Sequence, residues 1–272
     1  MPETSELLVL AIVLLVSGAA TGLLAGLFGV GGGALMVPVL YETFGFLGYA
    51  DSVRMPLAVG TSLAIIIPTS IRSYRAHKAR GAVDDALLRT WAVPIVIGVL
   101  MGAAIARFAP PVLMQGVFVL VAGVNAVKLL SGARWQVAPD LPKGAPLAGF
   151  GWLIGLLSSL MGIGGGQIAN IIMTLHGRGI HQAVATSAGI GLLIAVPGAL
   201  GYIGAGWGRA DLPPATLGFV SLLGLVLFAP TTVMTAGLGV RLAHGLSKRR
   251  LEVAFGLFLA VVCLRFVWAI FG

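Results

Sequence analysis

Two glycine-rich clusters interrupt apolar segments, one in each half of the 272-residue chain. They are Gly29-Val30-Gly31-Gly32-Gly33 and Gly162-Ile163-Gly164-Gly165-Gly166. In hydrocarbon, irregular backbone is tolerated only where protein buries it or where it lines a water-filled cavity. Interrupted apolar segments at corresponding places in two halves are typical of helices that break at a transporter's binding site. The clusters therefore predict two broken helices that face a substrate.

The composition indicates a membrane protein. The mean hydropathy is +1.03, and 58% of the residues are hydrophobic while only 10% are charged. This leaves too little polar surface to cover a water-soluble globule. The net charge of +8 comes from basic residues in short stretches between apolar runs, where they set orientation in the bilayer, so it does not indicate nucleic-acid binding. We expect an all-α polytopic membrane protein in contact with lipid, without a nucleic-acid partner.

Apolar runs of about membrane length, roughly 20 residues, recur along the chain. They lie near residues 7–28, 55–71, 86–106, 111–130, 146–161, 183–203, 213–240 and 251–270. Two shorter apolar pieces, 34–48 and 167–175, follow the glycine clusters. Each half is therefore predicted to hold a glycine-broken helical hairpin and three further transmembrane helices. Residues 1–6 contain no Lys or Arg, so we expect the first run to be a helix rather than a signal peptide.

The two halves resemble each other beyond the glycines. Ala58-Val59-Gly60-Thr61-Ser62 matches Ala183-Val184-Ala185-Thr186-Ser187, and each segment follows its glycine cluster. Such a recurrence indicates an internal duplication. The most polar and proline-rich stretch, 131–146, lies between the halves and is typical of a linker. We expect membrane repeat one at 1–131, a linker at 132–145 and membrane repeat two at 146–272.

The basic residues predict how the chain is oriented. Lys and Arg near helix ends collect on the cytoplasmic side of the membrane. The linker 132–145 and the loops 72–80 and 241–250 are therefore expected to be cytoplasmic in a bacterial inner membrane. With this count each glycine hairpin makes an even number of crossings and three crossings follow it, so the repeats are inverted relative to each other.

A broken helix exposes backbone N–H groups, and the half-helix after it presents its positive end, so an anion is the expected guest. The predicted backbone donors are Gly31, Gly32, Gly33, Gly164, Gly165 and Gly166, with side-chain donors from Gln167 and Asn170. Thr61, Ser62, Thr186 and Ser187 would form the surrounding polar wall. For the Thr-Ser pairs, helix capping or hydroxyl bonding to the preceding turn is an equal alternative.

Other interpretations of these residues fit less well. The spacing Gly29-x-Gly31-x-x-Ala34 matches a dinucleotide fingerprint but lacks the strand and βαβ unit that the fingerprint needs. Small-xxx-small helix packing suits Gly18 with Gly22, and Gly98 with Gly102. It does not explain four glycines in five residues, each of which costs a helix about 1 kcal/mol.

No catalytic or metal-binding set is visible in the sequence. His176 and His181 lack a nearby Cys, Asp or Glu, and two ligands make a poor metal site. The spans hold no nucleophile paired with a base. We therefore expect no metal, no cofactor and no enzymatic activity.

Several segments together resemble a known family over essentially the whole chain. They are the two glycine clusters, the Ala-x-x-Thr-Ser pairs, His77-x-x-x-Gly81-x-Val83-Asp84 and Leu212-Pro213-Pro214-x-x-Leu217-Gly218. With these segments the chain resembles the TauE/SafE sulfite exporters, also called 4-toluene sulfonate uptake permeases. The resemblance implies an inner-membrane protein that moves sulfite, sulfonates or related organosulfur anions.

The expected function is transport of a small anion, sulfite or an organosulfonate, by alternating access at a midplane site between the repeats. The alternative is a membrane assembly or scaffold protein that transports nothing. Its signature, a large soluble loop or a lipid-facing polar stripe, is not visible in the sequence. The exact substrate, the direction of transport, ion coupling and the oligomeric state are left open.

Overall fold

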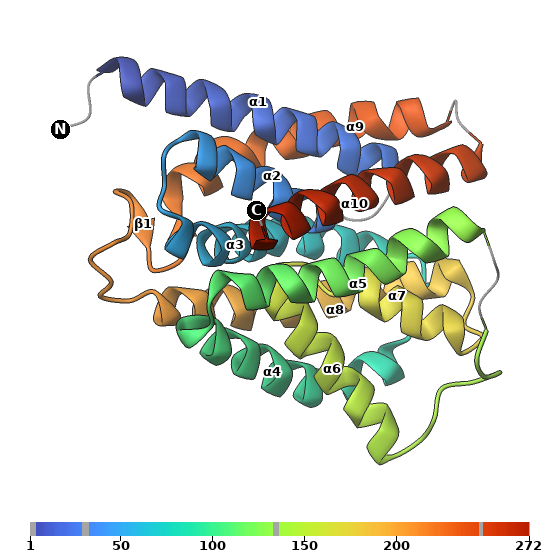
Figure 1. The fold of residues 1–272 in the computed structure, drawn as a ribbon. Helices are drawn as coiled ribbons and strands as arrows, with labels where there is room; N and C mark the ends of the chain where they lie inside the picture. Colours follow the sequence, from blue (N-terminus) through green and yellow to red (C-terminus); the bar gives the residue numbers. More distant parts are fainter. Residues whose placement is uncertain (1–3, 29–32, 133–135, 245–246, 272) are drawn as a thin grey trace.

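The structure is a computed structural model, and it describes residues 4–28, 33–132, 136–244 and 247–271. Within these residues the chain forms ten α-helices (Figure 1). They are α1 (Thr4–Phe28), α2 (Gly33–Phe46), α3 (Asp51–Lys78), α4 (Asp85–Phe108), α5 (Pro111–Ser131), α6 (Ala145–Met161), α7 (Gly166–Leu175), α8 (Ile180–Ala205), α9 (Ala229–His244) and α10 (Lys248–Phe271). A two-stranded hairpin, β1 (Thr216–Leu217) and β2 (Val220–Ser221), and a π-helical turn, η1 (Gly224–Phe228), precede α9.

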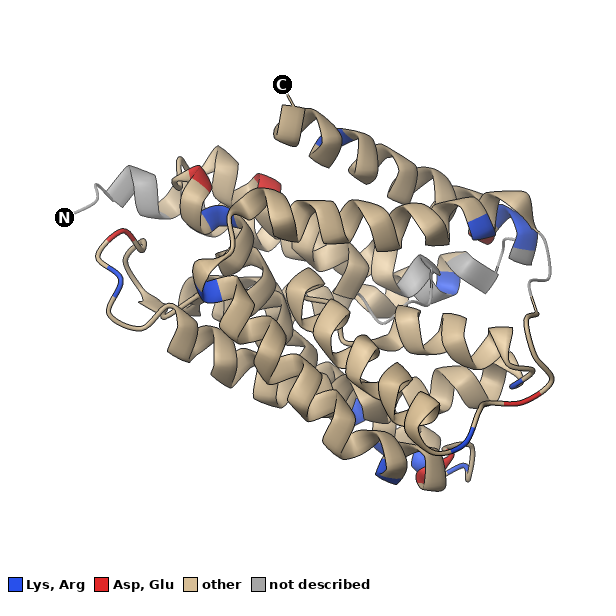
Figure 2. Ribbon diagram, turned by 60° about the horizontal axis from the view of Figure 1, so that its bottom comes forward, with Lys and Arg blue, Asp and Glu red and all other residues tan. Residues whose placement is uncertain are grey.

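Five helices are long and apolar enough to cross a membrane: α3, α4, α5, α8 and residues 249–271 of α10. The outer faces of the bundle carry exposed apolar side chains such as Val93, Leu120 and Leu264. Most charged residues lie toward the two ends of the bundle (Figure 2). An apolar belt between two charged ends fits a bilayer, whose hydrocarbon core is about 30 Å thick. The fold is thus helical with several candidate spans, as the sequence predicts.

The second glycine cluster breaks the helix, which confirms the prediction for that half. The C-terminal residue of α6 is Met161, and α7 begins at Gly166. Between them Gly162 and Gly165 adopt φ angles of +66° and +70°, a left-handed conformation that glycine adopts without strain. We call residues 162–165 the elbow. The corresponding residues 29–32 of the first half, Gly31 and Gly32 included, lie outside the described residues.

The α6–α7 unit returns to the end of the bundle where it starts. Val137, in the stretch that leads into α6, donates its backbone N–H to the Leu175 carbonyl at the end of α7, at 2.8 Å. The ten residues of α7 extend about 15 Å at 1.5 Å per residue. This helix therefore reaches about half-way across a bilayer, and its N-terminal end lies deep in the bundle.

One predicted apolar run is wrong at its start. Residues 213–240 were expected to form one helix, but the segment opens with Pro213 and Pro214 and then forms the β1–β2 hairpin. Proline supplies no backbone donor, and Ala215 and Gly218 have φ angles of 57° and 54°. Backbone hydrogen bonds outside a helix satisfy the polar groups of this segment instead. For example, the Phe219 N–H donates to the Tyr202 carbonyl at 3.1 Å. The helical part begins only with η1 and α9.

Close glycine packing joins the halves, as the small-residue spacing predicts. A Cβ added at Gly22 in α1 would lie 2.2 Å from the Thr232 carbonyl oxygen of α9. One added at Gly98 in α4 would lie 2.2 Å from the Trp152 carbonyl oxygen of α6. The Thr232 hydroxyl also donates to the Gly18 carbonyl at 3.0 Å. Helix α1 therefore packs on α9, and α4 packs on α6.

Helices α3 and α8 pack against each other and are the most buried of the five long spans. The two short helices lie beside them, with α2 on α3 and α7 on α8. The starts of α2 and α7 therefore lie close to the buried pair α3 and α8, and Gly33 at the start of α2 contacts the elbow. The candidate site lies at this junction.

Candidate functional site

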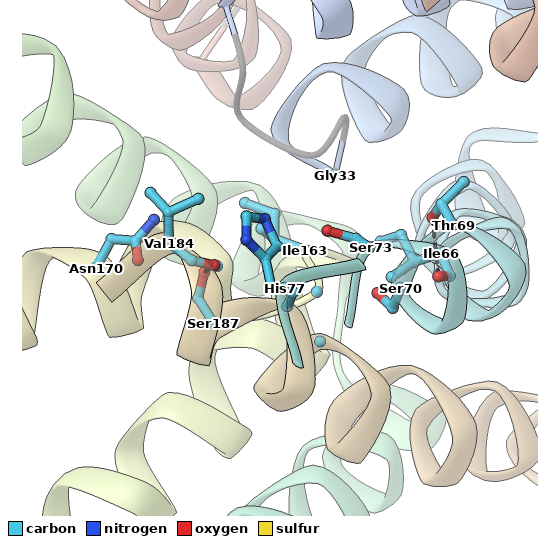
Figure 3. A pocket seen from close by; sticks show the side chains of 14 residues that line it. Gly33, Ile66, Thr69, Ser70, Ser73, His77, Ile163, Asn170, Val184 and Ser187 are labelled. Carbon is cyan, nitrogen blue, oxygen red and sulfur yellow. Dashed lines mark hydrogen bonds between the residues drawn. The ribbon is translucent and has the colours of Figure 1, made fainter. Parts of the chain in front are cut away.

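A cavity of about 210 Å³ lies where the start of α2, the elbow and the start of α7 meet α3 and α8. One water molecule occupies about 30 Å³ in the liquid, so the cavity has room for a small polyatomic ion. We call it the central cavity. Figure 3 shows Gly33 above it, Asn170 and Ser187 on one side, Ser70 and Ser73 on the other, and His77 between them.

The first half of the chain touches the elbow through Gly33, the first residue of α2. A Cβ added at Gly33 would lie 3.1 Å from the Gly164 nitrogen and 3.2 Å from the Ile163 Cα. Gly164 in turn lies against Ile66 of α3, whose Cγ2 would be 2.8 Å from an added Cβ. Backbone from both halves therefore meets at the cavity, and a side chain at Gly33 would push the elbow away by a few tenths of an ångström.

Two helix N-termini point their positive ends into this region. The first helical hydrogen bond of α7 runs from Ala169 N–H to the Gly165 carbonyl at 2.9 Å. The N–H groups before Ala169, including that of the cavity-lining residue Gly166, thus have no acceptor within the helix. Helix α2 starts at Gly33 on the other side. Two such ends favour a negatively charged guest, and the described lining residues include no Asp or Glu.

Five of the predicted site residues line the central cavity: Gly33, Gly164, Gly166, Asn170 and Ser187. The Asn170 side-chain oxygen is buried without a hydrogen-bond partner among the described residues. The Ser187 hydroxyl donates to the Val184 carbonyl at 2.9 Å. It has one hydrogen, so it can donate to an anion only if it rotates away from that carbonyl. These residues are the side-chain and backbone groups that an anion would meet.

Four polar side chains of the cavity, Thr69, Ser70, Ser73 and His77, come from α3 and were not predicted as site residues. The stretch 72–80 was interpreted as a loop, but α3 continues as a helix to Lys78. The spacing of three to four residues along 69, 70, 73 and 77 puts them on one helical face. This spacing could have indicated a polar helical face. The basic residues around it led instead to the prediction of a loop.

Thr61 and Thr186 do not line the central cavity. The Thr61 hydroxyl oxygen accepts the Ser221 N–H at 2.9 Å, and the Thr186 hydroxyl oxygen accepts the Asp84 N–H at 3.0 Å. Ser221 caps Gly224 N–H at the start of η1, and Asp84 caps Leu87 N–H at the start of α4, each at 3.0 Å. Both threonines therefore hold the residue that starts a helix in the other half of the chain.

Three further predicted residues lie next to the cavity without lining it. The Ser62 hydroxyl donates to the Gly162 carbonyl at 2.8 Å and holds the elbow from α3. Gly165 packs on α8, where an added Cβ would be 2.2 Å from Ile194 Cδ1. The Gln167 side chain is 4% exposed, and both of its polar atoms lack a hydrogen-bond partner among the described residues.

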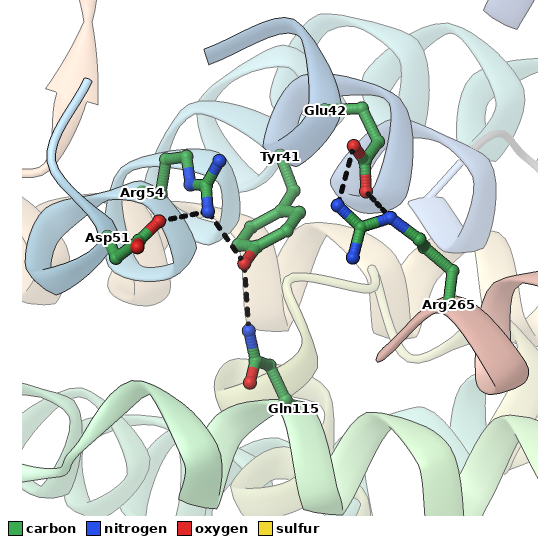
Figure 4. A network of polar contacts seen from close by, with 6 residues as sticks. All are labelled: Tyr41, Glu42, Asp51, Arg54, Gln115 and Arg265. Carbon is green, nitrogen blue, oxygen red and sulfur yellow. Dashed lines mark hydrogen bonds and ion pairs between the residues drawn. The ribbon is translucent and has the colours of Figure 1, made fainter. Parts of the chain in front are cut away.

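A polar network joins four helices at the end of the bundle where α3 begins (Figure 4). The Tyr41 hydroxyl accepts from Gln115 Nε2 at 3.0 Å and from Arg54 Nη2 at 3.2 Å. Arg54 also pairs with Asp51. Arg265 of α10 pairs with Glu42 of α2, with Nε 3.1 Å from Oε1. The network fixes α2 against α3, α5 and α10. Gln115 contributes the hydrogen bond that joins α5 to α2.

A second set of ion pairs lies at the opposite end. Arg178, in the loop between α7 and α8, approaches Asp140 at 3.3 Å and Asp84 at 3.8 Å. Lys78 at the end of α3 pairs with Asp85 at 3.3 Å. The Lys78–Asp85 pair is exposed, and exposed pairs stabilise a protein by only about 0–1 kcal/mol each. Among the described residues, no group of three or more His, Cys, Asp or Glu is arranged to hold a metal ion.

Comparison with known proteins identifies the family of the chain. The family model "Sulfite exporter TauE/SafE" matches residues 14–266. A "Probable membrane transporter protein" of Haemophilus influenzae is 33% identical over 253 residues, covering 92% of this chain and 95% of that protein. A similarly named protein of Methanocaldococcus jannaschii is 28% identical and covers 94% of this chain and 95% of its own length. No solved structure matches the chain significantly.

The family model and the relatives cover nearly the whole chain, including both glycine clusters and all the helices that form the central cavity. These relatives are named as membrane transporters, not as enzymes. The chain is a multi-pass membrane protein that belongs to the TauE/SafE sulfite exporter family of membrane transporters.

Proposed function

We propose that this protein transports a small anion, sulfite or an organosulfonate, by alternating access at the central cavity. The observation that carries the proposal is the contact of Gly33 with the elbow beside two helix N-termini. Sulfite and sulfonates carry negatively charged oxygens that accept hydrogen bonds from amide, hydroxyl and backbone N–H groups. Asn170 and the start of α7 supply amide and backbone N–H donors, and Ser187 supplies a hydroxyl that donates to the anion when it rotates away from the Val184 carbonyl. The family name supports the same substrate class.

Within this proposal the predicted site residues divide into two roles. Gly33, Gly164, Gly166, Asn170 and Ser187 bind the anion, since they line the central cavity. The others position the binding groups through the contacts given above: Ser62 and Gly165 at the elbow, Gln167 within α7, and Thr61 and Thr186 at the helix starts. Gly31 and Gly32 would complete the first half of the site.

We further propose that residues 1–131 and 146–272 are inverted repeats joined by the linker 132–145. Two features of the packing support this. The first helix of each half packs on the fourth helix of the other, α1 on α9 and α6 on α4. The matching residues Thr61 and Thr186 also make equivalent hydrogen bonds to helix starts in the opposite half. A two-fold arrangement of this kind allows one half to rock against the other around a fixed site.

The proposed orientation puts the linker end of the bundle in the cytoplasm of a bacterial inner membrane. Most of the Lys and Arg residues belong to this end, in the stretches 72–80, 128–143 and 241–250. Such residues are retained on the cytoplasmic side. The opposite end, with Asp51 and Asp211, has a more balanced charge.

Cysteine labelling of intact cells tests this orientation. The background is C263S, which removes the single native cysteine. A membrane-impermeant maleimide is expected to label K143C only after the cells are permeabilised, because Lys143 is exposed in the linker. It should label A210C, beyond the end of α8, without permeabilisation. The reverse pattern would contradict the orientation.

Transport itself is tested with the purified full-length protein in liposomes. Uptake of sulfite or of methanesulfonate should be saturable and about tenfold or more above that of protein-free liposomes. Sulfate serves as the comparison for selectivity. If neither sulfite nor methanesulfonate enters, the substrate class is wrong, and a membrane scaffold that transports nothing becomes the better account.

A further inference from the structure

His77 is the one ionisable side chain among the described residues that line the central cavity. It lies in the last turn of α3 and is partly buried. The remaining polar lining consists of neutral groups: hydroxyls of α3 and α8 and the amide of Asn170. The imidazole lies between the two sides of the cavity in Figure 3. A guest in the cavity therefore meets a full positive charge only when His77 is protonated.

The charged groups near His77 are either paired with one another or exposed, as Arg75 and Arg80 are. On its own helix Lys78 donates to Tyr74 at 2.9 Å and pairs with Asp85 of α4 at 3.3 Å, while the Arg75 side chain is exposed. Asp84 at the start of α4 pairs with Arg178 at 3.8 Å. The cavity-facing residues of α7 and α8, Asn170, Val184, Ser187 and Ala188, do not titrate. Among the described residues no ion pair joins His77 to a carboxylate.

Binding an anion in a poorly solvated cavity is more favourable when a full cationic charge compensates it, because charge-assisted hydrogen bonds are about twice as strong as neutral ones. A permanent cation would continue to bind the anion after the cavity has opened to the opposite side of the membrane, and it would slow release there. Imidazole gains and loses its charge between pH 5 and 8. It can therefore strengthen binding when protonated and weaken it when neutral.

We propose that protonated His77 binds the transported anion directly, so that substrate binding at the central cavity is coupled to uptake of one proton by the imidazole. This proposal rests on the proposed transport function and adds the ionisable group and the coupling ion to it. The proton comes from the aqueous phase that supplies the anion, and it leaves the imidazole when the anion is released.

The experiment measures uptake into liposomes with equal pH on both sides and the membrane potential clamped at zero. The probes are methanesulfonate, whose charge is fixed between pH 5.5 and 8.5, and sulfite, for which wild type and variant are compared at the same pH. The variant is H77Q, which keeps hydrogen bonding but cannot be charged. The matched control is H181Q, because His181 is exposed outside the cavity.

Wild type and H181Q should take up methanesulfonate about tenfold faster at pH 5.5 than at pH 8.5, as expected for a change of one charge-assisted contact. H77Q should show a flat pH profile and should lose about tenfold at pH 5.5. A second variant, H77R, has a permanent charge and should bind methanesulfonate with an affinity that does not change with pH. This variant also provides a readout if H77Q inserts poorly.

The outcomes separate the two proposals. If wild type transports either probe but its pH profile matches that of H77Q, the role of His77 is wrong and the transport function stands. If wild type transports neither probe at any pH, the proposed function fails and the coupling fails with it.

Discussion

Replacing Gly165 with leucine is expected to reduce anion uptake to the level of protein-free liposomes while the protein still inserts in the membrane. Gly165 has a φ angle of +70°, and a left-handed conformation costs an L-residue about 1–2 kcal/mol. An added Cβ would also lie 2.2 Å from Ile194 Cδ1 of α8. Overpacking of this kind costs about 1–3 kcal/mol more. Because the elbow starts α7, either distortion moves the donors that line the cavity.

The matched control for this variant is G149L. Gly149 lies in α6, is exposed, and has no atom within 4 Å of an added Cβ. Its uptake should equal that of wild type. G165A adds only the Cβ and should retain an intermediate rate. Wild-type uptake by G165L, with an unchanged elution profile in detergent, would mean that the elbow does not shape the transport site.

Filling the central cavity should abolish transport without unfolding the protein. Val184 of α8 lines the cavity, so the V184F side chain would enter empty space rather than a packed core. The stability cost should therefore be small, below the about 1–3 kcal/mol of an overpacked core. Uptake of sulfite and methanesulfonate should fall about 100-fold or to background, since the ring occupies the volume that the anion needs.

V196F is the matched control for V184F on the same helix. Val196 of α8 is 38% exposed on an outer face, where a larger apolar side chain contacts lipid. Its uptake and its thermal stability in detergent should match those of wild type. If V184F transports as fast as V196F, the anion does not pass through the central cavity.

The elbow was predictable from the sequence because its cause is local. Clustered glycines destabilise a helix wherever they occur, and the structure breaks the helix between Met161 and Gly166. The packing role of Gly22 and Gly98 was predictable for a similar reason, since their spacing puts small residues on one face. Both features depend on residues that are neighbours in the sequence.

Other features depend on contacts between distant residues, and the sequence pattern did not reveal them. The roles of Thr61 and Thr186 become visible only with their partners Ser221 and Asp84, 160 and 102 positions away. Hydropathy alone likewise interpreted 213–240 as one run, because apolar residues of a hairpin and of a helix score alike. His77 was assigned to a loop because the basic residues around it mask the helical face that it shares with Ser73.

The central claim is that backbone from the two halves encloses an anion-binding cavity between Gly33 and the elbow. A crystal structure of the protein with selenite, in which selenium takes the place of the sulfur of sulfite, tests it most directly. Anomalous scattering at the selenium edge should give a peak inside the cavity, within hydrogen-bonding reach of Asn170 or Ser187. A peak elsewhere in the protein and none in the cavity would contradict the account.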